Sequence, residues 1–329
     1  MTDRPITPGT LAADARRLLA AQRDEWPTAR DNFAALARVR TRELDVDGLR
    51  FRLQFNPARM VSTGAKVDPA AIAARPCFLC MANRPREQRA VELEGGYRLL
   101  VNPFPILPAH YTVPHAEHVP QRLDASSAAR LVRLSAEVGD DFVVFYNGPR
   151  CGASAPDHLH FQAGNAGTLP LEDEIEALIE RCGVPINDTV TLVASPLRPF
   201  VLMRSTDPFA VTADLMRVVD AWRRTAPPTP EGEEPKVNVL AWHKGGRHVV
   251  AVLPRTRHRP AFYFAQGDHR LMLSPASIDL AGLCVCPVER DFERITAADL
   301  RLMLSEVCPD AAMTARLAIA LRGVAYGEK

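Results

Sequence analysis

The sequence predicts an α+β protein in which short strands alternate with single helices. Apolar runs of strand length recur along the chain, for example at 97–102 and 142–146. A segment with helical spacing over 124–139 lies between two such runs and gives the order strand, helix, strand. With 329 residues the chain is also long for a single core and suits two modules. We therefore expect an α+β fold made of two modules.

The chain is expected to begin with two helices, followed by the first module. Leu11, Ala15 and Leu18 recur at helical spacing, and Pro27 interrupts the pattern. Strands are expected near residue 51 and over 97–102, 110–114, 142–146 and 158–162, with helices over 124–139 and 171–182. Gly183 directly after the last helix is in a common position for a residue that ends a helix.

Part of this order recurs in the second half. Strands are expected over 189–194, 200–204, 237–242, 249–254 and 261–264, and helices over 213–224, from 296 and over 309–322. Thr296 and Asp299 have the spacing of a capping box at the start of a helix. The sequence identity between the halves is too low to show a duplication directly.

Composition and charge exclude several classes of protein. The 40 Lys and Arg residues nearly balance the 39 Asp and Glu residues, so the formal charge is +1 and no basic surface for nucleic acid is expected. No run of about 18 apolar residues predicts a membrane helix, and the first five residues are polar or charged apart from Met1 and Pro5. We therefore expect a cytoplasmic protein with a small-molecule partner. The oligomeric state stays open, with a homodimer as one alternative.

Two of the seven cysteines have metal-ligand spacing. An odd number of cysteines in a chain of this size argues against a disulfide framework. Cys77 and Cys80 form a Cys-x-x-Cys pair, which with two distant imidazoles would make a tetrahedral zinc site. His115 and His118 compete for one of the imidazole positions. A redox pair or two plain thiols are the alternatives.

The most informative segment sets two imidazoles and an amide at i, i+2 and i+4. In a strand this spacing puts His158, His160 and Gln162 on one face. The preceding turn contains Gly152 and Ser154, where backbone N–H groups and a hydroxyl can approach a phosphate. An imidazole attacks phosphorus near neutral pH and leaves it easily. The segment therefore predicts a phosphate site that faces a nucleophile, with a merely polar strand face as the alternative.

Three segments in order resemble the histidine-triad superfamily of nucleotidyltransferases, and within it the galactose-1-phosphate uridylyltransferase branch. They are Cys77-Phe-Leu-Cys80, Val101-Asn102-Pro-Phe104-Pro105 with the run from His110 to His118, and Gly152-x-Ser154-x-x-His158-x-His160-x-Gln162. Glutamine stands where the hydrolase branch has a third histidine. The resemblance implies two histidine-triad-like modules, each an antiparallel sheet with flanking helices, the second degenerate. We expect N-terminal helices over 1–45, the catalytic module over 46–185 and the degenerate module over 186–329.

The resemblance also implies roles for particular residues. His160 would be the nucleophile, with Gln162 and Ser154 as the other catalytic residues. Substrate binding is expected from Asn102, Phe104, Asn147, Arg150, Gly152, His158 and Asp279. A structural zinc ion is expected on Cys77, Cys80, His118 and His158, and no organic cofactor is expected. Asp279 lies in a segment similar to the C-terminal signature of the GDP-hexose phosphorylases, which have glutamate at this place.

The expected reaction passes through a nucleotidyl-histidine intermediate. The neutral amide of Gln162 offers no base to activate water, so a phosphate acceptor is favoured over hydrolysis. The leading expectation is phosphorolysis of a nucleoside diphosphate sugar such as a GDP-hexose to a nucleoside diphosphate and hexose-1-phosphate. Uridylyl exchange with a sugar phosphate acceptor and phosphorolysis of a dinucleoside polyphosphate such as Ap4A are the alternatives. A nucleotide sensor without activity is the alternative from another class.

Overall fold

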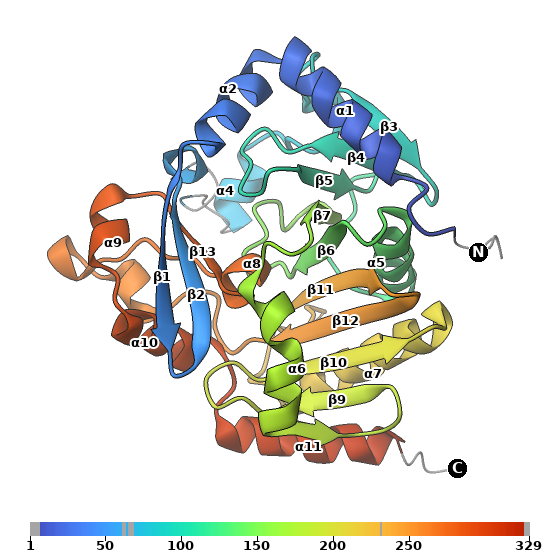
Figure 1. Cartoon of the computed structure of the whole chain (residues 1–329), viewed down its shortest axis with the longest axis vertical. Coiled ribbons are helices and arrows are strands. Elements are labelled where there is room, and N and C mark those ends of the chain that lie inside the picture. The colour runs from blue at the N-terminus through green and yellow to red at the C-terminus, as the bar shows by residue number, and fades with distance from the viewer. Residues whose placement is uncertain (1–6, 61–63, 65–68, 231, 326–329) are drawn as a thin grey trace.

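The computed structural model of the chain describes residues 7–60, 64, 69–230 and 232–325. One ten-stranded antiparallel sheet runs through the centre of the molecule (Figure 1). Its strand order is β3-β4-β5-β7-β6-β11-β12-β10-β9-β8. The strands are β3 (Ala90–Leu93), β4 (Tyr97–Val101), β5 (His110–Pro114), β6 (Phe142–Asn147), β7 (His160–Asn165), β8 (Gly183–Pro185), β9 (Val190–Val193), β10 (Phe200–Ser205), β11 (Val237–Lys244) and β12 (Arg247–Pro254).

The sheet consists of two halves with the same order of elements. In the first half, β4 and β5 are followed by helix α5 (Ala125–Glu137) and then by β6 and β7. In the second half, β9 and β10 are followed by helix α7 (Pro208–Thr225) and then by β11 and β12. The two halves join where β6 pairs with β11. The expected α+β fold of two antiparallel modules is confirmed, while the residue boundaries of the domains stay a prediction because both modules share one sheet.

Each face of the sheet buries its own apolar core. On one face, α1 (Ala12–Glu25), α2 (Pro27–Leu36), α5, α7 and α11 (Ala311–Ala325) cover the strands, with Leu131, Val218 and Trp222 fully or almost fully buried. The two expected N-terminal helices are therefore confirmed. Pro27 is the first residue of α2, where its missing N–H costs no hydrogen bond.

A small second sheet belongs to the core on the opposite face. Strand β2 (Leu49–Phe55) pairs antiparallel with β1 (Arg40–Val46) and parallel with β13 (Leu283–Cys286). Helices α6 (Pro170–Cys182), α8 (Ser277–Leu280), α9 (Glu289–Arg294) and α10 (Ala297–Val307) contribute to the same core or pack beside it. The pairing of β2 with β13 brings the C-terminal segment that contains Asp279 back to the first half of the chain.

Three local expectations need correction. Residues 261–264 form a 3-10 turn and no strand, because the amide of Tyr263 bonds back to the carbonyl of Pro260. Strand β7 starts at His160, so His158 precedes the strand. Gly183 ends α6 in an extended conformation with φ of −74°, and a β-carbon there would lie 2.5 Å from the carbonyl oxygen of Ile179. A glycine is therefore required here because the backbone of Ile179 lies too close for a β-carbon, and not because the helix ends in a left-handed cap.

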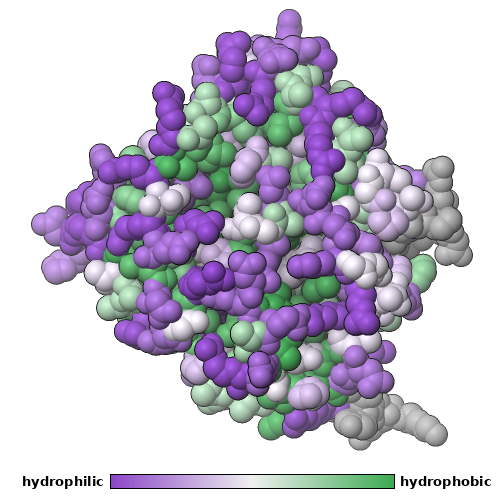
Figure 2. Space-filling view, viewed as in Figure 1, coloured by the Kyte–Doolittle hydropathy of each residue, from purple (hydrophilic) through white to green (hydrophobic). Residues whose placement is uncertain are grey.

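The described helices and the surface in Figure 2 bear on the expectation of no membrane helix. Among the residues that the structure describes, no helix combines the length and the apolar character that crossing a bilayer requires. Hydrophilic side chains cover much of the face in Figure 2, with apolar side chains in smaller areas between them. The first six residues, on which part of the expectation about location depended, lie outside the described residues.

Candidate active site

A cavity of about 740 Å³ lies where the two halves of the chain meet the segment after β2. The first half of the sheet and the turn before β7 line it with Ser154, His160 and Gln162, and the C-terminal part lines it with His258, Arg259 and Asp279. Trp26 and Thr28 at the junction of α1 and α2 also reach it. The volume is in the upper part of the range of about 300 to 1,000 Å³ that is usual for ligand pockets.

His160 is buried at the first position of β7, with 3% of its surface exposed. Its Nδ1 lies 2.8 Å from the carbonyl oxygen of His158. A carbonyl can only accept a hydrogen bond, so Nδ1 carries the proton and Nε2 keeps its lone pair. Burial lowers the pKa of His160 to about 4, so the ring is neutral near pH 7. The arrangement presents a nucleophilic nitrogen on a side chain that lines the cavity.

Gln121 holds the diverging ends of β6 and β7 together. Its amide nitrogen donates to the carbonyl oxygens of Asn147 at 2.8 Å and His160 at 3.0 Å. Its amide oxygen accepts the backbone N–H of His160 at 2.7 Å. These bonds replace the ladder that ends at the pair Phe145 and Gln162. The backbone of His160 is therefore fixed where it leaves the regular sheet.

His110 orients the amide of Gln162. The N–H of Ile106 donates to His110 Nδ1 at 3.1 Å, so the ring proton must lie on Nε2. That nitrogen is 2.9 Å from Gln162 Oε1 and donates to it. Burial lowers the pKa of His110 to about 3, which keeps the ring neutral. With its oxygen held in this way, Gln162 has its amide NH₂ group left as a donor toward a ligand.

The expected phosphate turn packs tightly against the C-terminal part of the chain. Gly152 has φ of +98°, and a β-carbon there would lie 2.5 Å from that of Ala276. Ser154 lines the cavity beside it. Arg75 donates to the carbonyl of Ser154 at 3.1 Å, which ties the turn to the segment before the cysteine pair. Only glycine fits both the left-handed conformation and the close contact at position 152.

Asn147 connects the turn to the second module. Its side-chain oxygen accepts the side-chain amide of Asn238 at 2.9 Å and the backbone N–H of Ser277 at 2.9 Å. Arg255 donates in turn to the side-chain oxygen of Asn238 at 2.7 Å and to the carbonyl of Pro275 at 3.0 Å. The side-chain oxygen of Asn147 is therefore committed to the protein, and its NH₂ group is the part that could donate to a ligand.

Asn102 and Phe104 line the cavity where the nucleoside was expected. The oxygen of Asn102 accepts the N–H of Phe104 at 3.0 Å, and its NH₂ group donates to the hydroxyl of Thr112 at 3.2 Å. Asn102 therefore shapes the turn that carries Phe104 and has fewer groups left for a ribose than the sequence indicated.

Asp279 lines the cavity from α8 as a buried carboxylate. Its two oxygens accept the backbone N–H groups of Ala276 at 2.9 Å and Val285 at 3.0 Å. Burial raises the pKa of Asp279 to about 6 although these bonds and Arg59 oppose the rise. The carboxyl keeps lone pairs that could accept a hydroxyl group.

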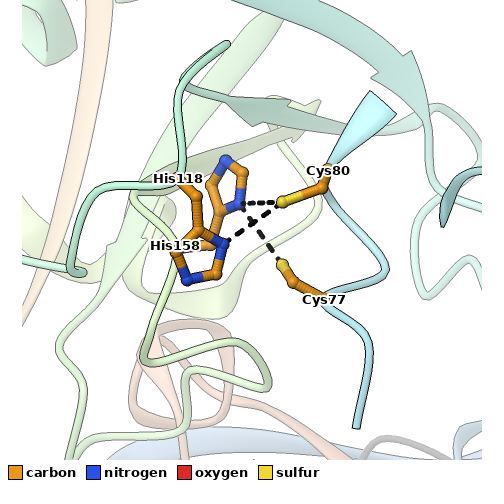
Figure 3. A group of neighbouring side chains, drawn as sticks. All are labelled: Cys77, Cys80, His118 and His158. Carbon is orange, nitrogen blue, oxygen red and sulfur yellow. Dashed lines mark hydrogen bonds between the residues drawn. The ribbon is translucent and has the colours of Figure 1, made fainter. Parts of the chain in front are cut away.

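The predicted metal ligands come together in one cluster (Figure 3). The ligand atoms of Cys77, Cys80, His118 and His158 lie within 4.8 Å of one another. Cys77 Sγ is 3.3 Å from His158 Nδ1, and Cys80 Sγ is 3.2 Å from His118 Nδ1. The set could hold one metal ion. Two thiolates and two imidazoles are a donor set that suits tetrahedral zinc.

Groups around the cluster fix the two imidazole rings. His158 Nε2 lies 2.8 Å from the carbonyl of His115 and donates to it, which leaves Nδ1 for the metal. His118 Nε2 is 3.6 Å from a carboxylate oxygen of Asp157. His115 itself accepts the N–H of Glu117 through Nδ1 and packs edge-on against Tyr97. The geometry therefore favours His118 over His115 as a ligand.

Two of the expected substrate-binding residues do not face the cavity. Both ring nitrogens of His158 are used by the cluster and by the His115 carbonyl, so none is left for a substrate. The side chain of Arg150 is half exposed and pairs with Glu233 at 2.5 Å. Their substrate-binding roles stay predictions without support from these contacts, whereas the place of His158 in the metal cluster agrees with the expectation.

The sequence did not single out three residues that shape the site. His110 was part of a segment in the resemblance but had no role, and neither Gln121 nor Arg59 belonged to a motif. Gln121 lies 39 residues from His160, and Arg59 lies 45 residues from Phe104, whose carbonyl it contacts at 2.8 Å. No local spacing connects such distant residues, so only a comparison of the folded chain could find them.

Comparisons with known proteins agree with this fold. The family described as "Domain of unknown function (DUF4922)" matches residues 18–165. Yeast Ap4A phosphorylase Apa2 has a similar structure, with 19% identity, a TM-score of 0.58 and coverage of 85% of this chain and 96% of that chain. The same yeast enzyme in complex with Ap4A gives 18% identity, a TM-score of 0.57 and coverage of 87% and 94%. No curated protein matches the chain. At this identity the likeness concerns the fold alone, and it agrees with the expected α+β fold of antiparallel sheets with flanking helices. Membership of the histidine-triad superfamily stays a prediction.

Proposed function

We propose that this protein is a nucleotidyltransferase that carries a nucleotide on His160 and passes it to a phosphate acceptor. The observation that carries the proposal is the pair of oriented side chains at the start of β7. His160 has its proton on Nδ1 and its lone pair on Nε2, and Gln162 has its amide oxygen held by His110. A nucleophile and a neutral donor thus line one cavity with the turn of Gly152 and Ser154.

The first step is attack by His160 Nε2 on the α-phosphorus of a bound nucleotide. The new P–N bond forms as the P–O bond to the leaving group breaks, and the leaving group departs with the electron pair. The hydrogen bond from Nδ1 to the His158 carbonyl stabilises the positive charge that develops on the ring. Ser154 and the NH₂ group of Gln162 can donate to the nonbridging oxygens, which carry charge in the loose transition state of phosphoryl transfer.

The second step reverses the first with another acceptor. An oxygen of the acceptor phosphate attacks the phosphorus, the P–N bond breaks, and its electron pair returns to Nε2. Water would need a base to compete, and an amide at position 162 cannot act as one. The burial of His160 also limits the access of water. Phosphorolysis or transfer is therefore favoured over hydrolysis.

The metal cluster would stabilise the chain segment that carries His160. Cys77, Cys80, His118 and His158 fit zinc, which in such a closed site contributes folding free energy. His158 would be both a ligand and, through its carbonyl, the acceptor for His160 Nδ1. The four residues thereby join three separate segments of the chain beside the nucleophile.

The leading substrate class is a dinucleoside polyphosphate, with orthophosphate as the acceptor. Its support is the similarity in fold to yeast Ap4A phosphorylase over 85% of this chain and 96% of that chain. A nucleoside diphosphate hexose is the second candidate, because Asp279 places a carboxyl that could accept sugar hydroxyls in the same cavity. Uridylyl exchange onto a sugar phosphate uses the same two steps with a larger acceptor.

The test is the mass of the intact protein after incubation with Ap4A, GDP-hexoses or UDP-hexoses. A nucleotidyl adduct on the wild type, absent from His160→Gly, would support the mechanism, and its mass would name the nucleotide. The products formed after orthophosphate or hexose-1-phosphate is added would then identify the acceptor. Turnover by His160→Gly at the wild-type rate without added imidazole would refute the role of this histidine.

A further inference from the structure

The cavity is also lined by a guanidinium group that has no acidic partner within ion-pairing distance among the described residues. Arg59 ends the 3-10 turn that follows β2 and lines the cavity. Its Nη1 donates to the carbonyl of Phe104 at 2.8 Å, and it forms no ion pair with any residue that the structure describes. A guanidinium group has five N–H donors. The side chain is thus a partly buried cation with one hydrogen bond to the residues that the structure describes.

The carboxyl group of Asp279 raises the pKa of Arg59 but forms no ion pair with it. Asp279 interacts with Arg59 at longer range, while its two oxygens accept the N–H groups of Ala276 and Val285. Burial lowers the pKa of Arg59 to about 10, and Asp279 opposes the change only in part. The group remains charged at neutral pH. Such a charge is costly to bury unless a partner of opposite sign is provided.

Two further nitrogen-rich side chains line the same cavity from the loop after β12. Arg259 donates through Nε to the hydroxyl of Ser274 at 2.8 Å and stacks over the ring of Tyr263 at 4.2 Å. His258 is half-buried, and burial together with Arg259 and Arg255 lowers its pKa to about 3. The imidazole is therefore neutral and can donate one hydrogen bond. Arg259 and Arg255 add positive charge around this ring.

Arg59 lines the same cavity as His160 and Gln162, from the segment after β2. Its charge also acts on His110, whose ring holds the amide of Gln162. A phosphate group bound by Arg59 would therefore lie in the cavity that holds the transferred phosphate, on a group that does not belong to the turn of Gly152 and Ser154. Guanidinium groups are well suited to phosphate oxygens because their N–H donors match them in pairs.

We propose that Arg59, together with His258 and Arg259, forms a second anion subsite that binds the phosphate group leaving from, or arriving at, the nucleotide on His160. The subsite takes the terminal phosphate of orthophosphate, of a hexose-1-phosphate or of a nucleoside diphosphate. The role of the subsite in holding a leaving or arriving phosphate rests on the proposed function. The binding of an anion to it requires no covalent step on His160. The two proposals can therefore fail separately.

The experiment measures the affinity of the full-length protein for orthophosphate, glucose-1-phosphate and ADP by calorimetry. Loss of a charge-assisted hydrogen bond costs about 1.5 to 3 kcal/mol, so Arg59→Gln should weaken binding roughly 10- to 100-fold. Arg59→Lys keeps the charge and should lose less. The matched control is Arg301→Gln, which removes an exposed arginine paired with Asp47 on the surface and should leave all three affinities unchanged.

Each outcome decides the proposal. The calorimetry measures binding without turnover, so a result for Arg59→Gln stands even if the nucleotidyl mechanism is wrong. Unchanged affinity in Arg59→Gln, with thermal denaturation showing a folded protein, would overturn the subsite, and so would a wild type that binds none of the three ligands. If Arg59→Gln does not fold, Arg259→Gln provides the same test from the other side of the wall. Tighter binding of glucose-1-phosphate or ADP than of orthophosphate would identify what accompanies the phosphate.

Discussion

Replacing His110 by phenylalanine tests whether Gln162 acts through a fixed orientation. The ring of phenylalanine fills most of the buried space but removes both nitrogen contacts. The N–H of Ile106 would lose its acceptor, and Gln162 Oε1 would lose its donor. We expect a loss of about 1 to 3 kcal/mol in the free energy of unfolding from the buried N–H that is left without a partner.

His110→Phe should lower the rate of nucleotidyl transfer less than Gln162→Ala, which removes the amide itself. An oriented donor to a developing charge contributes about 10²- to 10³-fold, and His110→Phe should retain part of this, so kcat is expected to fall about 10- to 100-fold. The assay is a double-mutant cycle with Gln162→Ala in the nucleotidyl-transfer reaction. If His110 acts through Gln162, the double variant should be no slower than Gln162→Ala alone. Fully multiplicative losses would refute this reasoning.

The same substitution has a pH signature with a defined sign. The pKa of His110 is about 3 in the folded protein, below the ordinary value of 6.5. The unfolded chain therefore binds this proton more readily, and the contribution of His110 to stability is present above pH 6.5 and is lost as pH falls toward 3. His110→Phe should lose less stability than the wild type between pH 7 and pH 4 in thermal denaturation. A larger loss in the variant would contradict the assignment of a neutral, buried ring.

Four further predictions concern other parts of the site. His160→Gly should form no nucleotidyl adduct by mass spectrometry, and added imidazole should restore part of the transfer because it can fill the vacated space. Cys80→Ser should lose bound zinc and melt at a lower temperature, whereas His115→Ala should keep zinc, as elemental analysis would show. Burial raises the pKa of Asp279 to about 6, so the protonated carboxyl contributes to the free energy of unfolding at low pH and this contribution is lost as pH rises from about 4 to 6. Asp279→Asn should remove this pH dependence from the free energy of unfolding. Gly152→Ala should cost about 1 to 3 kcal/mol and raise KM for the nucleotide, because the turn must move to admit a β-carbon.

Most of the fold and the chemical centre could be predicted from local patterns. The alternation in 159–162 sends Leu159 and Phe161 into the core and His160 and Gln162 toward the cavity, as the spacing indicated. The cysteine pair and the glycine turn were equally local signals. In each case a few neighbouring residues contain the whole pattern. Side chains in a strand alternate every two residues, and a tight turn is formed by about four residues.

The tertiary structure alone decided which distant groups complete these motifs. Both His115 and His118 have suitable spacing for the metal cluster, and only the path of the chain past Asp157 distinguishes them. The third strand of the small sheet pairs residues 283–286 with 52–55 across more than half of the chain. Arg59, Gln121 and His110 gain their roles through contacts with residues that lie far away in the sequence or across a turn. Such contacts depend on how the two halves pack, and no periodicity along the chain records that.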